Sequence, residues 1–588
     1  MADPKQGVVY TRTHEDPVWR APSREAVDGA AEPALVAGAA VVGTTTYSAP
    51  EGAMYVAPDG NNTNPGTLVS PKATLAGAIS AATTGSTIVL RAGEYHEEVT
   101  VPSTKTLTIQ AYPDEAVWFD GSTVYTQWSG TGPWTAPLGV AWSPIDSAGY
   151  NQEGDGLANL PEQVWFDGVA QTQVADNTIP GAGQFSVDRT TDVLTVGSDP
   201  VGSEVRVAEQ RVWMIAAGRV DLKGFGVRRY SPSEVEGSHA ALIYVAGTAN
   251  DSTMENMVFR DSGMHGLSIS RPTSLANVTV EECNNAGIQV TTADGSVIER
   301  FMIRQCNLGG WQREPITAAI KITRTDNILI RNGLVDTVYN AFGVWFDVSC
   351  TRFIVANVSV NATDIAFESE LSGGGFYDNA QHHSWFVNCR TTNAADWSMK
   401  IFDTDYVTVA NCDFDAVRVP INVQQDERYN VGDAGNKTFE IVPWVSGHNR
   451  LWNNKIIGSP SVATMIAYHD PATPVPNPDT GANEVILGWG FFDEIAGNWV
   501  PTVPPGNMIQ MGRIDGTRLT YNTWELAATS PSEVGGPPGE KLGTNHQGST
   551  IPSDIIAIPL PEDIANVLGV APGIQHVGAI VPALDASF

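Results

Sequence analysis

A short segment recurs along the middle of the chain at the interval expected for one coil of a solenoid. Aligned on their apolar residues, the clearest copies are LSIS at 267–270, IQVT at 288–291, IKIT at 320–323, VWFD at 344–347 and IAFE at 365–368. Their first residues are 21, 32, 24 and 21 positions apart. Each copy alternates apolar and variable residues, which predicts a short strand with one buried face. Strands repeated at this period predict stacked coils, each covering the apolar edge of the next.

Stacking places equivalent positions of successive strands in one column on the outside of the solenoid. The second position of the repeat gives the column Ser268, Gln289, Lys321, Trp345, Ala366 and Lys400, and the fourth gives Ser270, Thr291, Thr323, Asp347, Glu368 and Phe402. This alignment predicts that Asp347 and Glu368 are neighbours on adjacent strands, ~4.8 Å apart. Functional residues can therefore be sought column by column.

The composition limits the partners of the chain. Its 588 residues include 65 Asp and Glu against 33 Lys and Arg, for a formal net charge of −32. This excess of negative charge argues against nucleic acid or an anionic membrane as a partner. It also favours a neutral polysaccharide over an anionic one as a substrate.

Neither the cysteines nor the N-terminus predicts a special structure. The five cysteines lie within the repeat region and are expected to be buried and stacked, without zinc-site spacing. The first residues lack the basic start and apolar run of a signal peptide, so we expect no export by the common route. Residues 34–43 are apolar but too few to span a bilayer, so no membrane insertion is expected.

The segment before the repeats has a recognisable order. A turn cluster at 55–67 is followed by a short amphipathic helix at 73–82 and by alternating strands at 86–101 and 105–112. This order resembles the opening of right-handed parallel β-helix proteins of the pectin-lyase-like class. The resemblance covers roughly residues 52–470 and implies an all-β, right-handed parallel β-helix solenoid with an N-terminal capping helix. A helix over the first coil would cover the exposed end of the solenoid.

Composition and periodicity divide the chain into five parts. Residues 121–212 interrupt the coil period with Trp, Gly and Pro, and predict an inserted β subdomain like that of bacterial and phage β-helix proteins. The parts are an N-terminal arm or attachment segment at 1–50, the cap and first coils at 51–120, the inserted subdomain at 121–212, the main β-helix at 213–475 and a C-terminal segment at 476–588. The last part is expected to pack along the solenoid, with a helix that starts near Pro561 and ends near Gly569.

The stacked carboxylates are the candidate catalytic groups. Adjacent carboxyl groups tend to raise one pKa, which supplies a proton donor beside an ionised partner. Glycoside hydrolysis requires such a pair, so Asp347 and Glu368 are predicted to be catalytic. The predicted substrate-binding residues are Lys321, Trp345, Glu370, Lys400 and Asp403, with Trp345 as an aromatic face for a sugar ring.

Other interpretations of these residues remain open. The acidic cluster could bind a glycan or Ca²⁺ without turnover, although no cofactor is required. It could equally be a solvated face balanced by Lys321 and Lys400. His382 and His383 in the loop at 373–384 could reach the same face but are more simply exposed loop residues, and a lyase reaction using Lys321 or Lys400 is less favoured by the acidic charge.

Function follows from the site and the family resemblance together. The resemblance to tailspike and minor tail proteins implies a phage virion protein that engages, and could hydrolyse, host cell-surface polysaccharide. Its arm would bind other tail proteins, and by analogy it would be a homotrimer. The alternatives are a secreted bacterial glycoside hydrolase or lyase, acting outside the cell, and a purely structural tail component.

Overall fold

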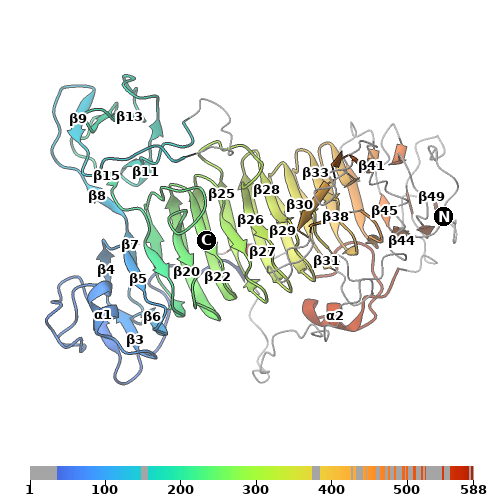
Figure 1. Ribbon diagram of the computed structural model, residues 1–588, viewed down its shortest axis with the longest axis horizontal. Helices are drawn as coiled ribbons and strands as arrows, with labels where there is room; N and C mark the ends of the chain where they lie inside the picture. The colour runs from blue at the N-terminus through green and yellow to red at the C-terminus, as the bar shows by residue number, and fades with distance from the viewer. Residues whose placement is uncertain are drawn as a thin grey trace.

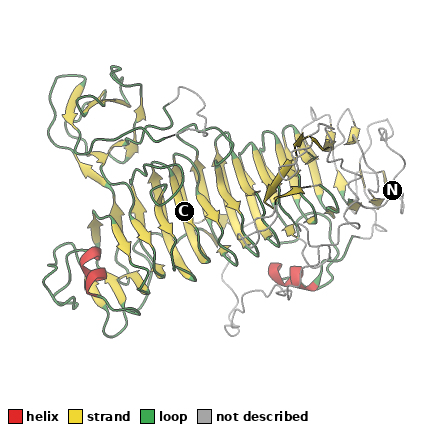
Figure 2. Ribbon diagram, viewed as in Figure 1, coloured by secondary structure: helices red, strands yellow, loops and turns green. Residues whose placement is uncertain are grey.

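The chain forms an elongated solenoid of stacked coils, with a smaller group of strands beside its first coils (Figure 1). The computed structural model describes residues 36–146, 157–373, 384–425, 428–431, 441–444, 446–458, 464–469, 475–476, 483–484, 493–496, 498–500, 507–511, 518–520, 523–524, 546–547, 557–581 and 585–586. The predicted arm therefore lies outside the described residues up to position 35. Strands dominate the described part, as Figure 2 shows.

One face of the solenoid is a 12-stranded parallel sheet. In spatial order its strands are β5 (Val99–Val101), β16 (Met214–Ala216), β19 (Ala241–Val245), β21 (His265–Ile269), β23 (Ile288–Thr291), β26 (Ala318–Thr323), β28 (Phe342–Asp347), β30 (Ile365–Glu370), β33 (Trp397–Phe402), β36 (Val419–Gln424), β41 (Thr464–His469) and β46 (Asn507–Met511). From β19 onward each strand pairs with the strand one coil later, so the repeat seen in the sequence is the coil of a right-handed parallel β-helix.

The other two faces share one continuous ladder of parallel strands. The first of them contains β2 (Met54–Val56), β3 (Thr87–Leu90), β6 (Leu107–Ala111), β17 (Val220–Lys223), β24 (Val297–Glu299), β31 (Ser384–Val387), β34 (Val407–Ala410), β39 (Arg450–Trp452), β44 (Glu494–Ala496) and β47 (Arg518–Thr520). The second contains β4 (Gly93–Tyr95), β7 (Val117–Asp120), β18 (Gly226–Arg228), β25 (Met302–Cys306), β32 (Arg390–Thr392), β35 (Asp413–Ala416), β40 (Lys455–Gly458), β45 (Trp499–Val500), β48 (Thr523–Trp524) and β49 (His546–Gln547).

Four longer strands run through both faces and bend at the corner between them. They are β20 (Ser252–Ser262), β22 (Thr273–Cys283), β27 (Leu329–Val338) and β29 (Ile354–Asn361). The bend falls on a left-handed asparagine in each, namely Asn256, Asn277, Asn332 and Asn357, with φ between 50° and 54°. Asparagine tolerates this conformation better than most residues. The sequence thus turns the chain at the same point in successive coils.

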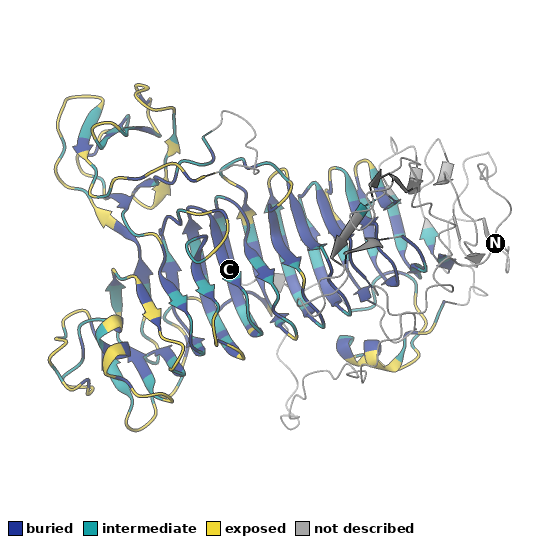
Figure 3. Cartoon of the chain, in the orientation of Figure 1, coloured by how far each residue is buried: buried dark blue, intermediate teal, exposed yellow. Residues whose placement is uncertain are grey.

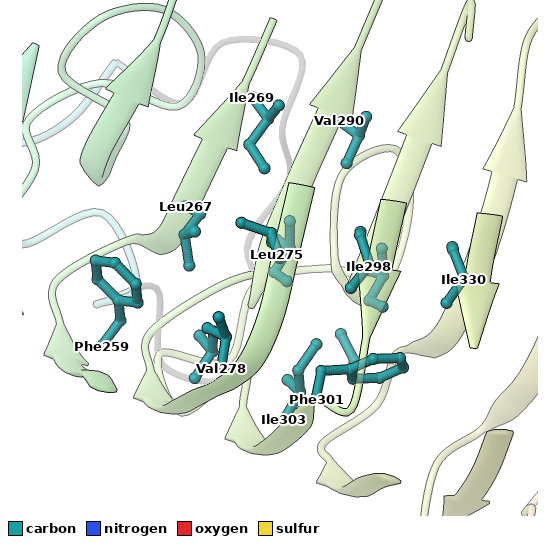
Figure 4. Packing of buried hydrophobic residues seen from close by; sticks show 14 of the residues in the cluster. Phe259, Leu267, Ile269, Leu275, Val278, Val290, Ile298, Phe301, Ile303 and Ile330 are labelled. Carbon is teal, nitrogen blue, oxygen red and sulfur yellow. The ribbon is translucent and has the colours of Figure 1, made fainter. Parts of the chain in front are cut away.

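The interior of the solenoid is a continuous apolar core. Side chains from all three faces meet there, and Figure 4 shows Leu267 and Ile269 of β21 beside Leu275 of β22 and residues of the following coils. All five cysteines belong to this interior, where they are buried and free. Cys283 and Cys306 lie opposite each other on the neighbouring strands β22 and β25. Figure 3 shows that burial is densest along the strands of the coils.

The predicted insertion folds as two four-stranded sheets. One contains β8 (Ser122–Val124), β15 (Val205–Ala208), β10 (Val164–Phe166) and β11 (Val169–Ala170), and the other β9 (Trp134–Pro137), β14 (Val193–Val196), β13 (Gln184–Asp188) and β12 (Thr172–Gln173). They share a separate apolar core. At the base of the insertion, the fully buried Asp120 of β7 accepts from the Ser122 backbone at 2.9 Å and from Arg228 at 2.7 Å, which ties the start of the insertion to the coils.

A short helix forms where the sequence predicts one. Helix α1 (Leu75–Ala81) begins after Thr74, whose side chain accepts from the Gly77 backbone, and buries Leu75 and Ile79 in the solenoid core. Whether it shields the end of the solenoid, as predicted, remains a prediction. No helix in the described ranges is long and apolar enough to cross a bilayer.

Segments from near both ends of the chain lie along the asparagine corner. Helix α2 (Glu562–Leu568) ends at Gly569 as predicted and packs Ile564 and Val567 on the first of the two ladder faces. The chain then bonds successive corner residues: Asn411 donates to His576 O at 2.6 Å, and Val581 N donates to Asn388 at 2.8 Å. This C-terminal segment thus follows the corner from coil to coil.

The N-terminal side continues the same line. Gly38 N donates to Arg300 O at 2.9 Å and Ala39 N to Thr279 Oγ1 at 2.9 Å. Where the segments meet, β1 (Val36–Ala37) pairs in parallel with β50 (Asp585–Ala586). We call the two segments, residues 36–48 and residues 557–581 with 585–586, the terminal strap. Within the predicted C-terminal segment at 476–588, residues 557–581 pack along the solenoid, whereas the strands β44 to β49 continue its coils beyond residue 475.

Two small antiparallel pairs complete the described strands. They are β37 (Arg428–Val431) with β38 (Ile441–Trp444), and β42 (Val475–Pro476) with β43 (Asn483–Glu484). The first pair matters for the site, since it carries Arg428 over the outer face of the 12-stranded sheet.

Candidate active site

The register of β28 and β30 corrects the predicted carboxylate pair. Asp347 lies opposite Glu370, and Glu368 lies opposite Trp345. The alignment of IAFE with VWFD was therefore wrong by two residues, and Asp347 and Glu368 are not directly stacked. A slip of two keeps Glu368 on the outer face because strand side chains alternate with a period of two.

The physical reason lies in the apolar residues that begin these strands. Ile365 points outward and packs with Phe342 and Trp345, while Ala366 belongs to the interior core. The sequence alignment took Ile365 as an inward residue because it is the larger of the two. Ile365 instead pairs with Phe342, and the predicted place of Ala366 in the outer column was wrong.

The corrected columns place most candidate residues together. Two rows of side chains cross the outer face of the 12-stranded sheet. The first, which we call the inner row, contains Gln289, Lys321, Trp345, Glu368, Lys400 and Asn422. The second, which we call the outer row, lies two residues further along each strand and contains Thr291, Thr323, Asp347, Glu370, Phe402 and Gln424. The stacked carboxylates are Asp347 and Glu370, with side chains 15% and 11% exposed. Solvent can reach this pair.

Lys321 and Trp345 hold the pair from the inner row. Lys321 Nζ lies 2.8 Å from Asp347 Oδ2 and also donates to the Pro315 carbonyl. The same ammonium is 3.3 Å from the centre of the Trp345 ring, a cation–π contact, and Trp345 Nε1 donates to Glu370 Oε2 at 3.1 Å. Trp345 stacks on Phe342 and is only 2% exposed, so it orients Glu370 and is not the sugar platform that we predicted.

Arg428 holds the pair from the other side. Its guanidinium donates to Glu370 Oε1 and, at 2.7 Å, to Asp403 Oδ2. It also lies 4.0 Å above the Phe402 ring. Asp403 is fully buried and accepts from Gln425 at 3.1 Å, so it anchors Arg428 from beneath. Both oxygens of Glu370 thus have a donor, one from Trp345 and one from Arg428.

Glu368 and Lys400 are buried opposite each other beside these groups. Lys400 Nζ lies 2.7 Å from Glu368 Oε1. Both side chains are almost completely buried. Burial raises the pKa of Glu368 to about 8, against the opposing effect of Lys400. Burial also raises the pKa of Asp347, and the ion pair with Lys321 opposes this.

Two groups of loop residues flank this part of the sheet. On the inner-row side, Trp311 and Ile316 pack with Met264 and Val235 in a small apolar cluster. On the outer-row side, Leu371 packs with Trp444 of β38, whose partner β37 carries Arg428. The carboxylates therefore lie on a floor of strands between two sets of loops.

The arrangement bears on the predicted Ca²⁺ alternative. Within the described ranges no three Asp, Glu, His or Cys side chains are placed to share a metal ion. Asp347 and Glu370 already face Lys321 and Arg428, which supply positive charge where a cation would. His382 and His383 lie outside the described residues.

Arg428 was missed by the sequence analysis. It is about 60 residues from Glu370 in the chain and reaches it only through a long excursion from the coil. Its signal in the sequence was weak, one basic residue in a long segment between two repeat strands. Glu370, in contrast, was predicted as a binding residue, and its position in the stacked pair follows from the corrected register.

Comparison with known proteins gives similarity in structure only. The sequence matches no model of a protein family and no curated protein. A solved complex of XylC with xylose covers 91% of this chain and 99% of its own, with a TM-score of 0.60 and 14% identity.

Two other solved structures superpose less well. A glycoside hydrolase covers 64% of this chain and 94% of its own at a TM-score of 0.47 and 12% identity, and pectate lyase Pel9A covers 76% and 83% at 0.26 and 14%. The fold argument therefore rests on the first structure and on the strand register. This chain has the right-handed parallel β-helix fold.

Proposed function

We propose that this protein is a glycoside hydrolase in which Asp347 and Glu370 are the catalytic pair. The observation that carries the proposal is their in-register position on adjacent strands, partly open to solvent and flanked by cationic side chains. Glycoside hydrolysis needs one carboxylic acid to protonate the leaving oxygen and one carboxylate on the other side of the bond. XylC, which is similar in structure, was solved in complex with xylose, and this supports a sugar as the ligand.

The spacing favours retention of configuration. Adjacent strands are ~4.8 Å apart, close to the ~5–5.5 Å between the carboxyl groups of retaining enzymes and below the ~6.5–9.5 Å of inverting ones. In the first step, one carboxyl gives its proton to the glycosidic oxygen while the other attacks the anomeric carbon and forms a glycosyl ester. Water then attacks that carbon, and the first group takes up the proton of the water. Two displacements restore the original configuration.

The surrounding residues position the pair. Lys321 and Arg428 balance two negative charges that would otherwise repel across one strand spacing. Trp345 and Arg428 fix the direction of both Glu370 oxygens. Glu368 and Lys400 are buried beneath the site, and we assign them to its support and not to contact with substrate.

Amide variants test the assignment. Asp347→Asn and Glu370→Gln should each lower kcat/KM on aryl glycosides of neutral sugars, aryl xylosides first, by about 10²–10⁴-fold. Glu115→Gln is a matched control, since Glu115 is also ion-paired but to Arg91 on the first coils. Azide rescue assigns the roles: the variant of the nucleophile gives a glycosyl azide of inverted configuration, and the variant of the acid gives a retained one.

Two results would reject the proposal. One is unchanged activity in both amide variants. The other is products that carry a carbon–carbon double bond, which would show a lyase. Loss of activity in Glu368→Gln, with Asp347→Asn and Glu370→Gln unaffected, would instead reject the corrected pair.

The biological setting remains as the sequence predicts it. We propose a phage tail protein acting on host cell-surface polysaccharide, with a secreted bacterial enzyme and a structural tail component as alternatives. Tail genes on both sides of the coding sequence, and a trimer by light scattering, would support the first. Neighbouring genes for sugar uptake, with a monomer in solution, would support the second.

A further inference from the structure

Exposed apolar side chains gather along one edge of the 12-stranded sheet. Leu308, Tyr339 and Val417 are 47%, 46% and 57% exposed, and each follows closely on a strand of the second ladder face: β25, β27 or β35. In each case the chain then enters the 12-stranded sheet, at β26, β28 or β36. Equivalent places in different coils thus expose large apolar groups, which marks the edge as a contact surface.

Trp397 lies on this edge on a rigid apolar base. It is the first residue of β33, is partly exposed, and packs against the outward cluster formed by Ala318, Phe342, Trp345 and Ile365. Ile365 and Trp397 are opposite each other on neighbouring strands, and Phe342 is opposite Ile365. The indole is therefore fixed from below while part of its surface is open.

Charged side chains of both signs surround the Trp397 ring. Arg313 lies 3.1 Å from Asp396 and 3.6 Å from Asp364, and Arg418 lies 3.5 Å from Asp396. The Arg418 guanidinium is 5.7 Å from the Trp397 ring centre, and its side chain is 66% exposed. Glu314 also lies 3.9 Å from Arg313, so two guanidinium and three carboxylate groups leave a net charge of about −1 and present many donors and acceptors. Such a rim suits a ligand that is uncharged and rich in hydroxyl groups.

The spacing of the aromatic residues suits an extended polymer. Tyr339 precedes Phe342 by three residues, and Phe342 and Trp397 are two strands apart in one row, ~9.6 Å along the solenoid. That separation is close to the length of two pyranose units in an extended chain. The distance to the catalytic pair is larger: Glu370 is opposite Phe402, five residues from Trp397 and so ~16 Å along the strand. One sugar cannot contact both.

We propose that this edge, which we call the Trp397 edge and define by Arg313, Tyr339, Asp396, Trp397 and Arg418, binds a neutral, extended polysaccharide apart from the bond that is cleaved. Trp397 and Tyr339 provide the stacking surfaces, and the charged rim bonds the sugar hydroxyls. The edge would keep a polymer on the protein between cleavage events. The polymer is the substrate class of the proposed hydrolase, but binding here needs no turnover.

The experiment measures binding in a background without catalysis. The Asp347→Asn/Glu370→Gln double variant is run in affinity gels and titrations with soluble xylan and soluble mixed-linkage β-glucan, and with polygalacturonate as the anionic comparison. Adding Trp397→Ala should weaken binding to a neutral polymer by about tenfold, the equivalent of ~1.4 kcal/mol. Tyr339→Ala should weaken it less, and Trp397→Phe should restore part of it.

Tyr112→Ala is the matched control, since Tyr112 is also a partly exposed aromatic under an arginine, but on the first coils. In the active protein, Trp397→Ala should raise KM for the polymer and leave kcat/KM for an aryl monosaccharide unchanged. Equal polymer binding by the Trp397→Ala and parent proteins would overturn the proposal. So would a parent protein that binds neither neutral polymer, or one that binds polygalacturonate more tightly than the neutral polymers.

These outcomes separate the two proposals. Loss of binding in Trp397→Ala, together with full activity of Asp347→Asn and Glu370→Gln, would support the edge and reject the catalytic pair. Activity that depends on the pair, with binding indifferent to Trp397, would do the reverse.

Discussion

Glu368 should make the stability of this protein depend on pH in a direction set by its burial. Its pKa is raised to about 8 because desolvation outweighs the attraction of Lys400. Between pH ~4.5 and ~8 the folded chain therefore keeps a proton that the unfolded chain has lost. The free energy of unfolding falls as the pH rises through this window, since the folded state binds more protons there.

The structure also sets the size of the effect. A pKa raised from 4.5 to about 8 corresponds to about 5 kcal/mol, at ~1.36 kcal/mol per pH unit. The side chain is 0% exposed, so solvent screening does not reduce this figure. Glu368→Gln has no proton to lose, so its unfolding free energy should vary less between about pH 5 and pH 9, by up to ~5 kcal/mol.

Urea unfolding followed by tryptophan fluorescence at several pH values measures this difference. Glu115→Gln serves as the control, because the ion pair with Arg91 lowers the pKa of Glu115 and so confines its titration to acid pH. This variant should lose stability without a change of slope between about pH 5 and pH 9. Parallel slopes for the wild type and Glu368→Gln would refute the argument that Glu368 is held neutral by burial.

Three further variants test other parts of the structure. Arg428→Lys keeps a positive charge but cannot bridge two carboxylates, so kcat/KM should fall about tenfold or more with an unchanged circular dichroism spectrum; full activity would remove Arg428 from the site. Asp120→Asn should cost about 3–5 kcal/mol in urea unfolding because it leaves the buried Arg229 without its ion pair, and a cost below about 1 kcal/mol would show that the network is dispensable. Ile564→Ala should cost about 2–5 kcal/mol if the terminal strap unfolds with the coils, and no cost would show that the strap unfolds separately.

The sequence was sufficient for the fold because the fold repeats. Inward residues such as Leu267, Ile288 and Ile320 recur in every coil, so errors in one copy are corrected by the others. Asparagines at the corner strengthen the same pattern. The short helices at 75–81 and 562–568 were also predictable, from local amphipathicity in the first case and from Pro561 and Gly569 in the second.

The site was predictable only in part, for three physical reasons. First, a period of two identifies the face of a strand but not its register. Because the outward Ile365 resembled an inward residue, Glu368 was placed where Glu370 lies. Second, Arg428 reaches the pair from a long excursion, and contacts of this kind leave no periodic signal. Burial was equally invisible: Trp345 and Glu368 were expected on the surface, but neighbouring side chains cover both.

The pairing of β1 with β50 has a consequence for the timing of folding. Coils can stack in order as a ribosome releases them, since each contacts mainly its neighbours. Val36, however, must wait for Asp585, about 550 residues later, which at ~5–20 residues per second takes roughly 30–110 s. Until then the corner of the growing solenoid has no cover over Asn388 and Asn411. Folding therefore continues after the coils have stacked, with closure of the C-terminal part of the terminal strap over the corner.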